Sequence, residues 1–245
     1  MIGTIALGVF GLAVLLSVAL AFSDNRREID WKMVLSGVGL QLFFAILVIL
    51  VPGGRQFFEG LSAVFVRVIS FSLDGAAFIF GPLADQSNLG FIFAFQVLPT
   101  IIFIASIFAV LYYLGIMQVV VGTVGGWLHR LLKTSHPESI SAVSNIFVGH
   151  TDAPLVIRPY LKNMTESELF AVMVGGCATI ASAVMMGFAQ LGVELKYLIT
   201  ASCMAAPGGL LMAKLMIPET EERRERFDPG NLGDTDKPVN VFEAI

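Results

Sequence analysis

The residues best suited to chemistry lie in one short run that begins at Asn145. Asn145 contributes an amide, His150 an imidazole, Thr151 a hydroxyl and Asp152 a carboxylate, and Gly149 separates the amide from the other three. The sequence on both sides is apolar enough to lie in lipid, where polar side chains are costly and irregular backbone survives only beside protein or water. A run of this kind predicts a small-molecule site inside a membrane transporter.

This polar run would divide a helix into two halves that meet near the middle of the membrane. Residues 138–148 make about 16 Å of helix, roughly half the width of a bilayer core. Unpaired carbonyls at the end of that half, with the Asn145 side-chain oxygen, can hold a dehydrated monovalent cation. His150, Thr151 and Asp152 can form hydrogen bonds with a flat polar ligand. The alternative is that these side chains satisfy one another or only cap the half-helices, since Asp152 stands where an N-cap would.

A second stretch of interest is the small-residue segment 175–182 in the helix that follows. Small residues let helices approach closely in a membrane, and close packing is the favoured interpretation of this segment. Alternatively, Thr179 could add a hydroxyl to the site, and local unwinding would expose carbonyls near Ile180.

Composition points to a membrane protein and away from other classes. The chain is 56% hydrophobic and 14% charged, whereas a soluble domain carries about 25% charged residues, and its mean hydropathy is +0.81. No basic run or nucleic-acid motif is present, which argues against nucleic-acid binding. No protease, hydrolase or phosphate-loop signature is present either, so the chain is not expected to be an enzyme. Cys177 and Cys203 are expected to be packing residues.

Hydrophobic segments and turn signals predict an all-α integral membrane protein. About five transmembrane helices are expected, the last kinked or unwound at residues 207–209, and they fall at residues 2–22, 33–51, 90–114, 166–190 and 197–217. Two amphipathic helices are expected in the membrane interface, at residues 56–71 and 117–132. Asp74-Gly75 and Gly81-Pro82 are expected to interrupt the chain after the first of these. One re-entrant helical hairpin is expected at residues 138–162, and Thr165 and Glu168 form a capping-box pattern before the next span.

These elements group into consecutive units along the chain. Residues 1–55 form a scaffold of transmembrane helices, residues 56–89 an amphipathic interfacial region, and residues 90–135 the third span with the second amphipathic helix. Residues 136–217 hold the ligand-binding hairpin and the two spans after it, and residues 218–245 form a cytoplasmic loop or tail.

The positions of Lys and Arg predict the orientation in the membrane. Cytoplasmic loops of membrane proteins carry an excess of these residues. If the N-terminus lies outside, only Arg55, Arg67 and Lys196 among the 15 basic residues fall on the outer side. We therefore expect a multi-pass protein of the plasma membrane with an external N-terminus.

Several motifs carry a family resemblance that spans nearly the whole chain. The segment at 149–169, GHTDAPLVIRPYLKNMTESEL, resembles the hairpin of the concentrative nucleoside transporters, and so does the segment at 90–103, GFIFAFQVLPTIIF. Further matching segments are LYYLG at 111–115, ATIA at 178–181, AP at 206–207 and PETE at 218–221.

The resemblance implies secondary active uptake of nucleosides, usually driven by sodium and in some members by protons. It implies a homotrimer in a lipid bilayer, with a scaffold and a mobile transport region in each subunit, and no cofactor beyond the coupling ion. Carried over position by position, it implies that sodium is bound by Asn145, Val148, Thr179 and Ile180. It implies that the nucleobase pocket is lined by Gly149, His150, Thr151 and Asp152.

The chain departs from the family in two places. Where the family usually has Gly-Gln-Thr-Glu, this chain has His150 and Asp152 in the second and fourth positions, so the base preference does not transfer, and His150 offers a route to proton dependence. The chain also stops where the second half of the family's fold begins. We therefore expect the N-terminal half of a prokaryotic sodium-coupled nucleoside transporter. A truncated, non-transporting membrane scaffold is the alternative, and an intramembrane enzyme using His150 and Asp152 is a more distant one.

Overall fold

The computed structural model describes residues 2–85 and 89–221, and within these ranges every regular element is a helix. The predicted all-α fold is therefore confirmed, while most of the predicted tail at residues 218–245 lies outside the described residues. In chain order the elements are α1 (Ile2–Ala21), α2 (Trp31–Ile49), α3 (Pro52–Phe80), η1 (Gly81–Ala84), α5 (Phe93–Tyr113), α6 (Ile116–Leu132), α7 (His136–Phe147), α8 (Ala153–Val156), η2 (Arg158–Asn163), α9 (Glu166–Ala178), α10 (Ser182–Gln190) and α11 (Leu195–Met216).

Several of these helices match predicted membrane spans. Within the described residues, α2, α5 and α11 correspond to predicted spans and are long and apolar enough to cross a membrane. The segment Pro52–Ala84 is also long and apolar enough, although an interfacial region was predicted there. The first predicted span corresponds to α1, in which the part with described side chains, Leu7–Ala21, is apolar but shorter. The span predicted at residues 166–190 is divided between α9 and α10.

Helix α3 differs from the prediction because it is longer. The predicted interruption at Asp74-Gly75 is wrong, since α3 continues to Phe80 and ends only at Gly81, whose φ is +55°, and Pro82. A glycine inside a helix costs about 1 kcal/mol relative to alanine, which is too little to end a helix whose Ser72 side packs against α5. A position in the membrane interface stays a prediction for residues 56–71.

Helix α6 begins and ends close to the predicted limits, but its buried stripe is shifted. Val121, Leu128 and Leu132 of the predicted apolar side are buried, whereas Val120 and Val124 are exposed. The buried face of α6 lies against α7 at Gly125, where an added Cβ would be 2.8 Å from Ile140 Cγ1. Close approach to α7 therefore decides which face of α6 is covered.

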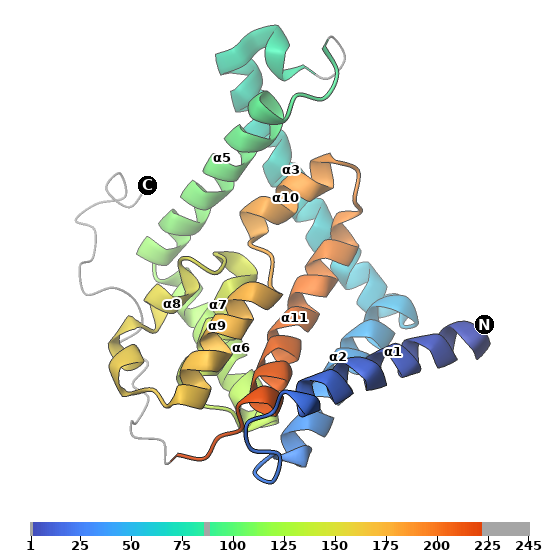
Figure 1. Cartoon of the computed structure of the whole chain (residues 1–245). Helices are drawn as coiled ribbons and strands as arrows, with labels where there is room; N and C mark the ends of the chain where they lie inside the picture. The colour runs from blue at the N-terminus through green and yellow to red at the C-terminus, as the bar shows by residue number, and fades with distance from the viewer. Residues whose placement is uncertain (1, 86–88, 222–245) are drawn as a thin grey trace.

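Helix α11 lies at the centre of the fold and runs unbroken through Pro207 (Figure 1). It contacts α1, α2, α3, α7, α9 and α10. Of the two outcomes predicted for residues 207–209, a kink or an unwound segment, unwinding is wrong because the helix is continuous there, and the kink stays a prediction. A Cβ added at Gly208 would collide with Gln41 Nε2 of α2, and one added at Gly209 would lie 3.3 Å from Ala178 Cβ of α9. The glycines therefore let two helices approach α11 closely, as small residues do in membrane proteins.

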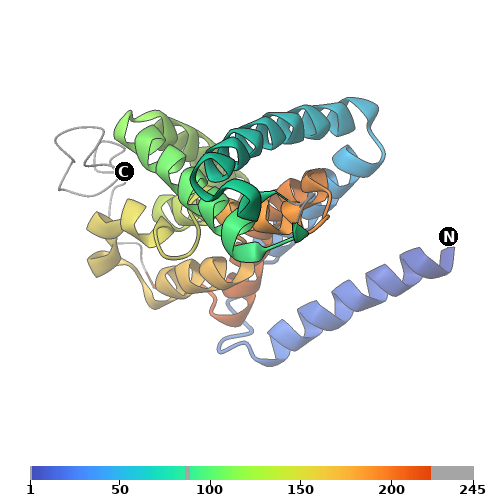
Figure 2. The ribbon, with the colours of Figure 1, turned by 90° about the horizontal axis from the view of Figure 1, so that it is seen from above.

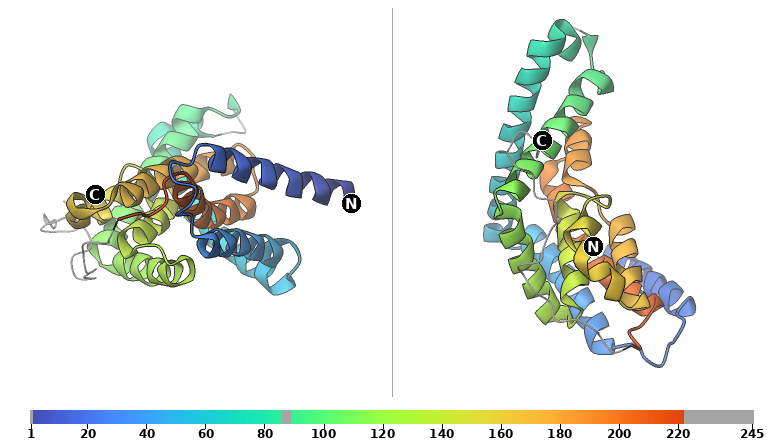
Figure 3. Two further views of the ribbon diagram at one scale, coloured as in Figure 1. Left: turned by 60° about the horizontal axis from the view of Figure 1, so that its bottom comes forward. Right: turned by 90° about the vertical axis from the view of Figure 1, so that its left-hand side faces the viewer.

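Most of the remaining helices pack around α11, but α1 and one end of the α3–α5 pair extend away from the rest (Figure 2, Figure 3). Viewed from above, α1 projects away from the other helices (Figure 2). Ala19, near its C-terminal end, belongs to a buried cluster with Leu211 and Leu215 of α11. The side view shows α3 and α5 running together beyond the rest at one end (Figure 3). The main core joins residues of α2, α6, α7, α9 and α11, and this part holds α7 and the turn after it.

Candidate functional site

The chain turns back directly after α7, as predicted for residues 138–162. Helix α7 begins with a capping box formed by Ser135 and Glu138 and ends at Phe147. Gly149 follows with φ +88°, a left-handed conformation that favours glycine. The chain then descends through α8 and η2 (Figure 1). The return arm is broken into a four-residue α-helix and a six-residue 3₁₀-helix, because Pro159 disfavours helical backbone at Arg158.

The helix after this turn-back is itself interrupted. Helix α9 ends at Ala178 and α10 begins at Ser182. Thr179 between them is extended, with φ −114° and ψ 158°. The less favoured alternative for this segment, local unwinding near Ile180, is therefore correct. A break inside a span frees backbone carbonyls from the helical hydrogen-bond pattern and makes them available to a ligand.

The turn after α7 packs directly on the break between α9 and α10. The Ser182 hydroxyl donates a hydrogen bond to the Phe147 carbonyl. A Cβ added at Gly149 would lie 2.6 Å from Ala181 Cβ, and one added at Gly176 would lie 3.0 Å from His150 Cβ. Two irregular segments that lie far apart in the sequence are thus side by side.

Asn145 is the most unusual side chain at this junction. It is completely buried, and neither Oδ1 nor Nδ2 has a hydrogen-bond partner in the described structure. A Cβ added at Gly175 of α9 would lie 3.4 Å from its Nδ2. A buried polar group without a partner costs about 1–3 kcal/mol, which makes this amide a candidate for binding a ligand.

The residues predicted to bind sodium come from the two irregular segments. Asn145 and Val148 lie at the end of α7, while Thr179 and Ile180 lie in the break. The Thr179 hydroxyl donates to the Gly175 carbonyl at 2.9 Å. That bond uses the hydroxyl proton and leaves the oxygen lone pairs as acceptors.

The residues predicted to bind the nucleobase form the tip of the turn. Gly149 is buried, whereas His150, Thr151 and Asp152 are exposed. Asp152 precedes α8 but makes no side-chain capping hydrogen bond. The alternative that Asp152 serves only as an N-cap therefore lacks the contact that defines one.

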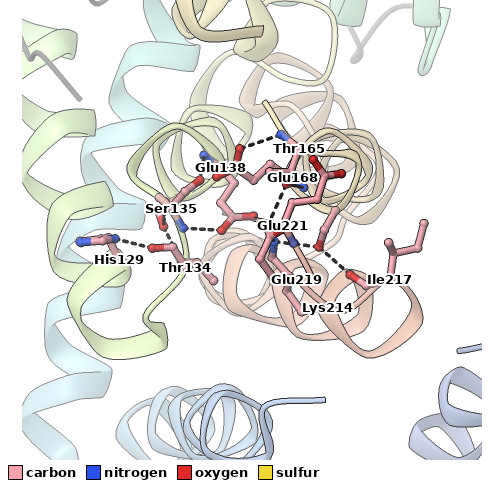
Figure 4. A network of polar contacts seen from close by, with 12 residues as sticks. His129, Thr134, Ser135, Glu138, Thr165, Glu168, Lys214, Ile217, Glu219 and Glu221 are labelled. Atoms are coloured by element: carbon pink, nitrogen blue, oxygen red, sulfur yellow. Dashed lines mark hydrogen bonds and ion pairs between the residues drawn. The ribbon is translucent and has the colours of Figure 1, made fainter. Parts of the chain in front are cut away.

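A buried ionic cluster at the base of α7 was not predicted (Figure 4). Lys214 Nζ of α11 lies 2.9 Å from Glu138 Oε2 and 3.2 Å from Glu219 Oε2. The same ammonium donates to Ser167 Oγ at 2.9 Å, and the Thr165 hydroxyl donates to Glu219 Oε2 at 2.9 Å. Burial raises the pKa of Glu138, and the Lys214 charge opposes that rise. We call this set, Glu138, Thr165, Ser167, Lys214 and Glu219, the basal cluster.

The basal cluster joins three helix ends, namely the start of α7, the start of α9 and the end of α11. The predicted capping box of Thr165 and Glu168 is confirmed at the start of α9. A signal for the rest was present in the sequence. Lys214 is the one charged residue in the span predicted at residues 197–217. A charged side chain inside a membrane span is usually paired with another polar group.

Comparison with known proteins places this geometry in a family. Residues 10–83 match the family model described as Na+ dependent nucleoside transporter N-terminus, and residues 94–194 match the model described as Nucleoside recognition. The chain is 51% identical to an uncharacterized transporter of Haemophilus influenzae and 46% identical to the nucleoside permease NupC of Helicobacter pylori, in each case over 97% of this chain and 57% of the relative. It is 39% identical to the rat sodium/nucleoside cotransporter 2, over 96% of this chain and 35% of the relative.

Solved structures agree with these relatives. CNTnw in an inward-facing substrate-bound state matches with a TM-score of 0.89 at 45% identity, over 96% of this chain and 56% of that one. The chain thus spans little more than half the length of the bacterial relatives it matches. The named relatives are transporters rather than enzymes, and with the apolar helices they identify a multi-pass membrane protein. The chain belongs to the concentrative nucleoside transporter family and corresponds to the N-terminal portion of its members.

Proposed function

We propose that this chain takes part in secondary active uptake of nucleosides coupled to sodium, and that it supplies the cation site and the nucleobase side of the substrate site. The observation that carries the proposal is the buried, unpartnered amide of Asn145 at the junction of two broken helices. The names of the Helicobacter permease and the rat cotransporter support the substrate and the coupling ion. The proposal includes a homotrimer in the plasma membrane with an external N-terminus, for which the distribution of basic residues is the support.

The proposed sodium ligands are oxygen atoms from both sides of the junction. Asn145 offers its side-chain oxygen, Thr179 its hydroxyl, and Val148 and Ile180 their backbone carbonyls. Carbonyls at the end of a broken helix suit a dehydrated cation, because the helix dipole places partial negative charge there. Binding sodium would also hold the turn after α7 against the α9–α10 break.

The proposed nucleobase contacts come from the tip of the turn. Asp152 accepts hydrogen bonds only, whereas a neutral His150 donates through one ring nitrogen and accepts through the other. Together with the Thr151 hydroxyl, these groups match the donors and acceptors on the edge of a base. Their exposure within this chain leaves them accessible to a substrate.

Replacing Asn145 by alanine is expected to weaken sodium coupling. Loss of one ion ligand worth about 1–3 kcal/mol corresponds to a roughly 5- to 150-fold rise in the sodium concentration for half-maximal uptake. Uptake of labelled uridine into proteoliposomes over a sodium series measures this concentration. Asn25→Ala, in the exposed loop before α2, is the matched control and should behave like the parent protein. Uptake by the parent protein that does not depend on sodium would contradict the ion assignment, and uptake driven by a proton gradient alone would favour protons.

Replacing Asp152 by asparagine is expected to act on the substrate rather than on the ion. Loss of a hydrogen bond to a charged group, worth about 1.5–3 kcal/mol, should raise the KM for nucleoside roughly 10- to 150-fold, with little change in the sodium dependence. Competition among uridine, adenosine and guanosine in the same uptake assay shows which base depends on this carboxylate. Asp24→Asn, in the exposed loop after α1, is the control. An unchanged KM for all three nucleosides would remove Asp152 from the pocket.

A further inference from the structure

A stripe of buried polar side chains runs along α7 from its base to the proposed cation site. It consists of Glu138, Ser141, Ser144 and Asn145, and the exposed fraction of each is 0%. At 100° per residue these positions fall within about one third of the helix circumference. Among the described residues, Glu138 Oε2, Ser141 Oγ and both amide atoms of Asn145 have no hydrogen-bond partner, and Ser144 Oγ has none apart from the neighbouring Tyr112 hydroxyl. Glu138 Oε2 does form an ion pair with Lys214.

The unpartnered atoms of this α7 stripe need partners that are enclosed with them. More than nine in ten buried polar groups in proteins are hydrogen-bonded to protein or to ordered water. A further protein segment cannot supply the missing bonds, because these atoms are already covered by the chain and nothing outside can touch them. Small molecules inside the fold can, and buried water commonly makes about three hydrogen bonds to such groups.

A neighbouring helix adds a hydroxyl to the same region. Tyr112 Oη of α5 is also buried, and it lies within reach of a hydrogen bond with the Ser144 hydroxyl. The two serine hydroxyls and the tyrosine hydroxyl can each donate one hydrogen bond and accept others. These are the groups that a row of water molecules requires.

The two ends of the α7 stripe have different chemical surroundings, namely the proposed sodium ligands at one end and the basal cluster at the other. At the upper end is Asn145, beside the proposed sodium ligands. At the lower end, Glu138 forms an ion pair with Lys214. Lys214 and Glu219 also line a pocket of about 190 Å³, together with Glu28 and Asp30. Two carboxylates surround one ammonium in the basal cluster, so its net charge favours cations over anions.

We propose that the α7 stripe binds a row of water molecules, and that a small monovalent cation exchanges along this row between the proposed sodium site and the pocket beside the basal cluster. The path from Glu138 to Asn145 covers seven residues of helix, or about 10 Å. This inference rests on the proposed function for the identity of the cation, while the row of water molecules rests on the unpartnered atoms alone.

The test uses silver ion, a small monovalent cation that reacts with thiolates. Ser141→Cys and Ser144→Cys are made in the full chain with Cys177→Ala and Cys203→Ala, which removes both native thiols. Val143→Cys is the matched control, since Val143 is 1% exposed on the same helix but lies away from the stripe. After exposure to silver, the protein is denatured, and labelling of the remaining thiols with a fluorescent maleimide gives the rate of reaction.

We expect silver to react at least about tenfold faster with the two stripe cysteines than with Val143→Cys, because a dry buried thiol reacts only through local opening of the fold. Sodium should slow the reaction at Ser144→Cys by occupying the adjacent site. Equal rates at all three positions would overturn the proposal, and so would an absence of sodium protection. Because the silver reaction needs neither nucleoside nor uptake, its failure is distinguishable from failure of the proposed function, which shows as sodium-independent transport.

Discussion

Replacing Lys214 by methionine is expected to destabilise the protein by about 3–5 kcal/mol, the usual effect of removing one partner from a buried ion pair. The Glu138 side chain is 0% exposed and that of Lys214 is 9% exposed, so the variant would leave a buried carboxylate without its cation. The α7 base, the α9 start and the α11 end would lose the group that joins them. Thermal unfolding of the purified protein in detergent measures the loss.

Two further variants and the pH dependence separate this explanation from a general effect of mutation. Lys196→Met removes an ion pair with Glu194, whose side chain is 62% exposed, and is expected to change the unfolding temperature little. Adding Glu138→Gln to Lys214→Met should restore part of the stability, because it removes the uncompensated charge. Burial raises the pKa of Glu138 and the charge of Lys214 opposes that rise, so without Lys214 the carboxyl is harder to ionise in the folded state than in the unfolded state. The deficit of Lys214→Met is therefore smallest at low pH and grows as the pH rises past the ordinary range of a glutamic acid. A deficit independent of pH, or one as large for Lys196→Met, would contradict the ion-pair explanation.

Replacing Gly149 by alanine is expected to abolish most transport. The added methyl group would meet Ala181 Cβ at 2.6 Å, and alanine is disfavoured at a φ of +88°. Strained backbone contributes about 1–3 kcal/mol, and overpacking contributes a similar amount. Both act where the turn after α7 contacts the α9–α10 break, so the proposed sodium ligands would separate. Nucleoside uptake and the sodium dependence of uptake measure the effect.

The chain offers a control for each component of the Gly149 effect. Gly192 has a φ of +99° but no atom within 4 Å of an added Cβ, so Gly192→Ala carries the backbone strain without the collision. It should lose some stability and retain sodium affinity. Adding Ala181→Gly to Gly149→Ala removes the opposing methyl group and should restore part of the uptake. If that second change restores nothing, the contact between the turn and the break is not what Gly149 preserves.

Much of the site chemistry follows from local sequence. The polar run from Asn145 to Asp152 lies between apolar segments, and this contrast predicts a ligand site and a chain reversal after α7. Gly, Pro and capping residues also predict the helix ends near residues 147 and 163. The same kind of local pattern predicts the capping box of Thr165 and Glu168. The helix interruption at Thr179 is harder to predict from sequence, because the small residues around it are equally typical of a continuous helix that packs closely against its neighbours.

The sequence by itself determined an all-helical membrane protein with a polar turn, because helix periodicity, apolar length and turn residues act over a few neighbouring positions. Only the tertiary structure decided that Asp74-Gly75 and Pro207 lie inside continuous helices. Packing against neighbouring helices outweighs a cost of about 1 kcal/mol at a glycine and about 3 kcal/mol at a proline. It also decided which distant groups meet, since Ser182 lies at the Phe147 carbonyl and Lys214 lies between Glu138 and Glu219. Asn145, by contrast, has no hydrogen-bond partner among the residues that the structure describes. These pairings depend on how whole helices approach one another, and no local pattern of residues specifies that approach.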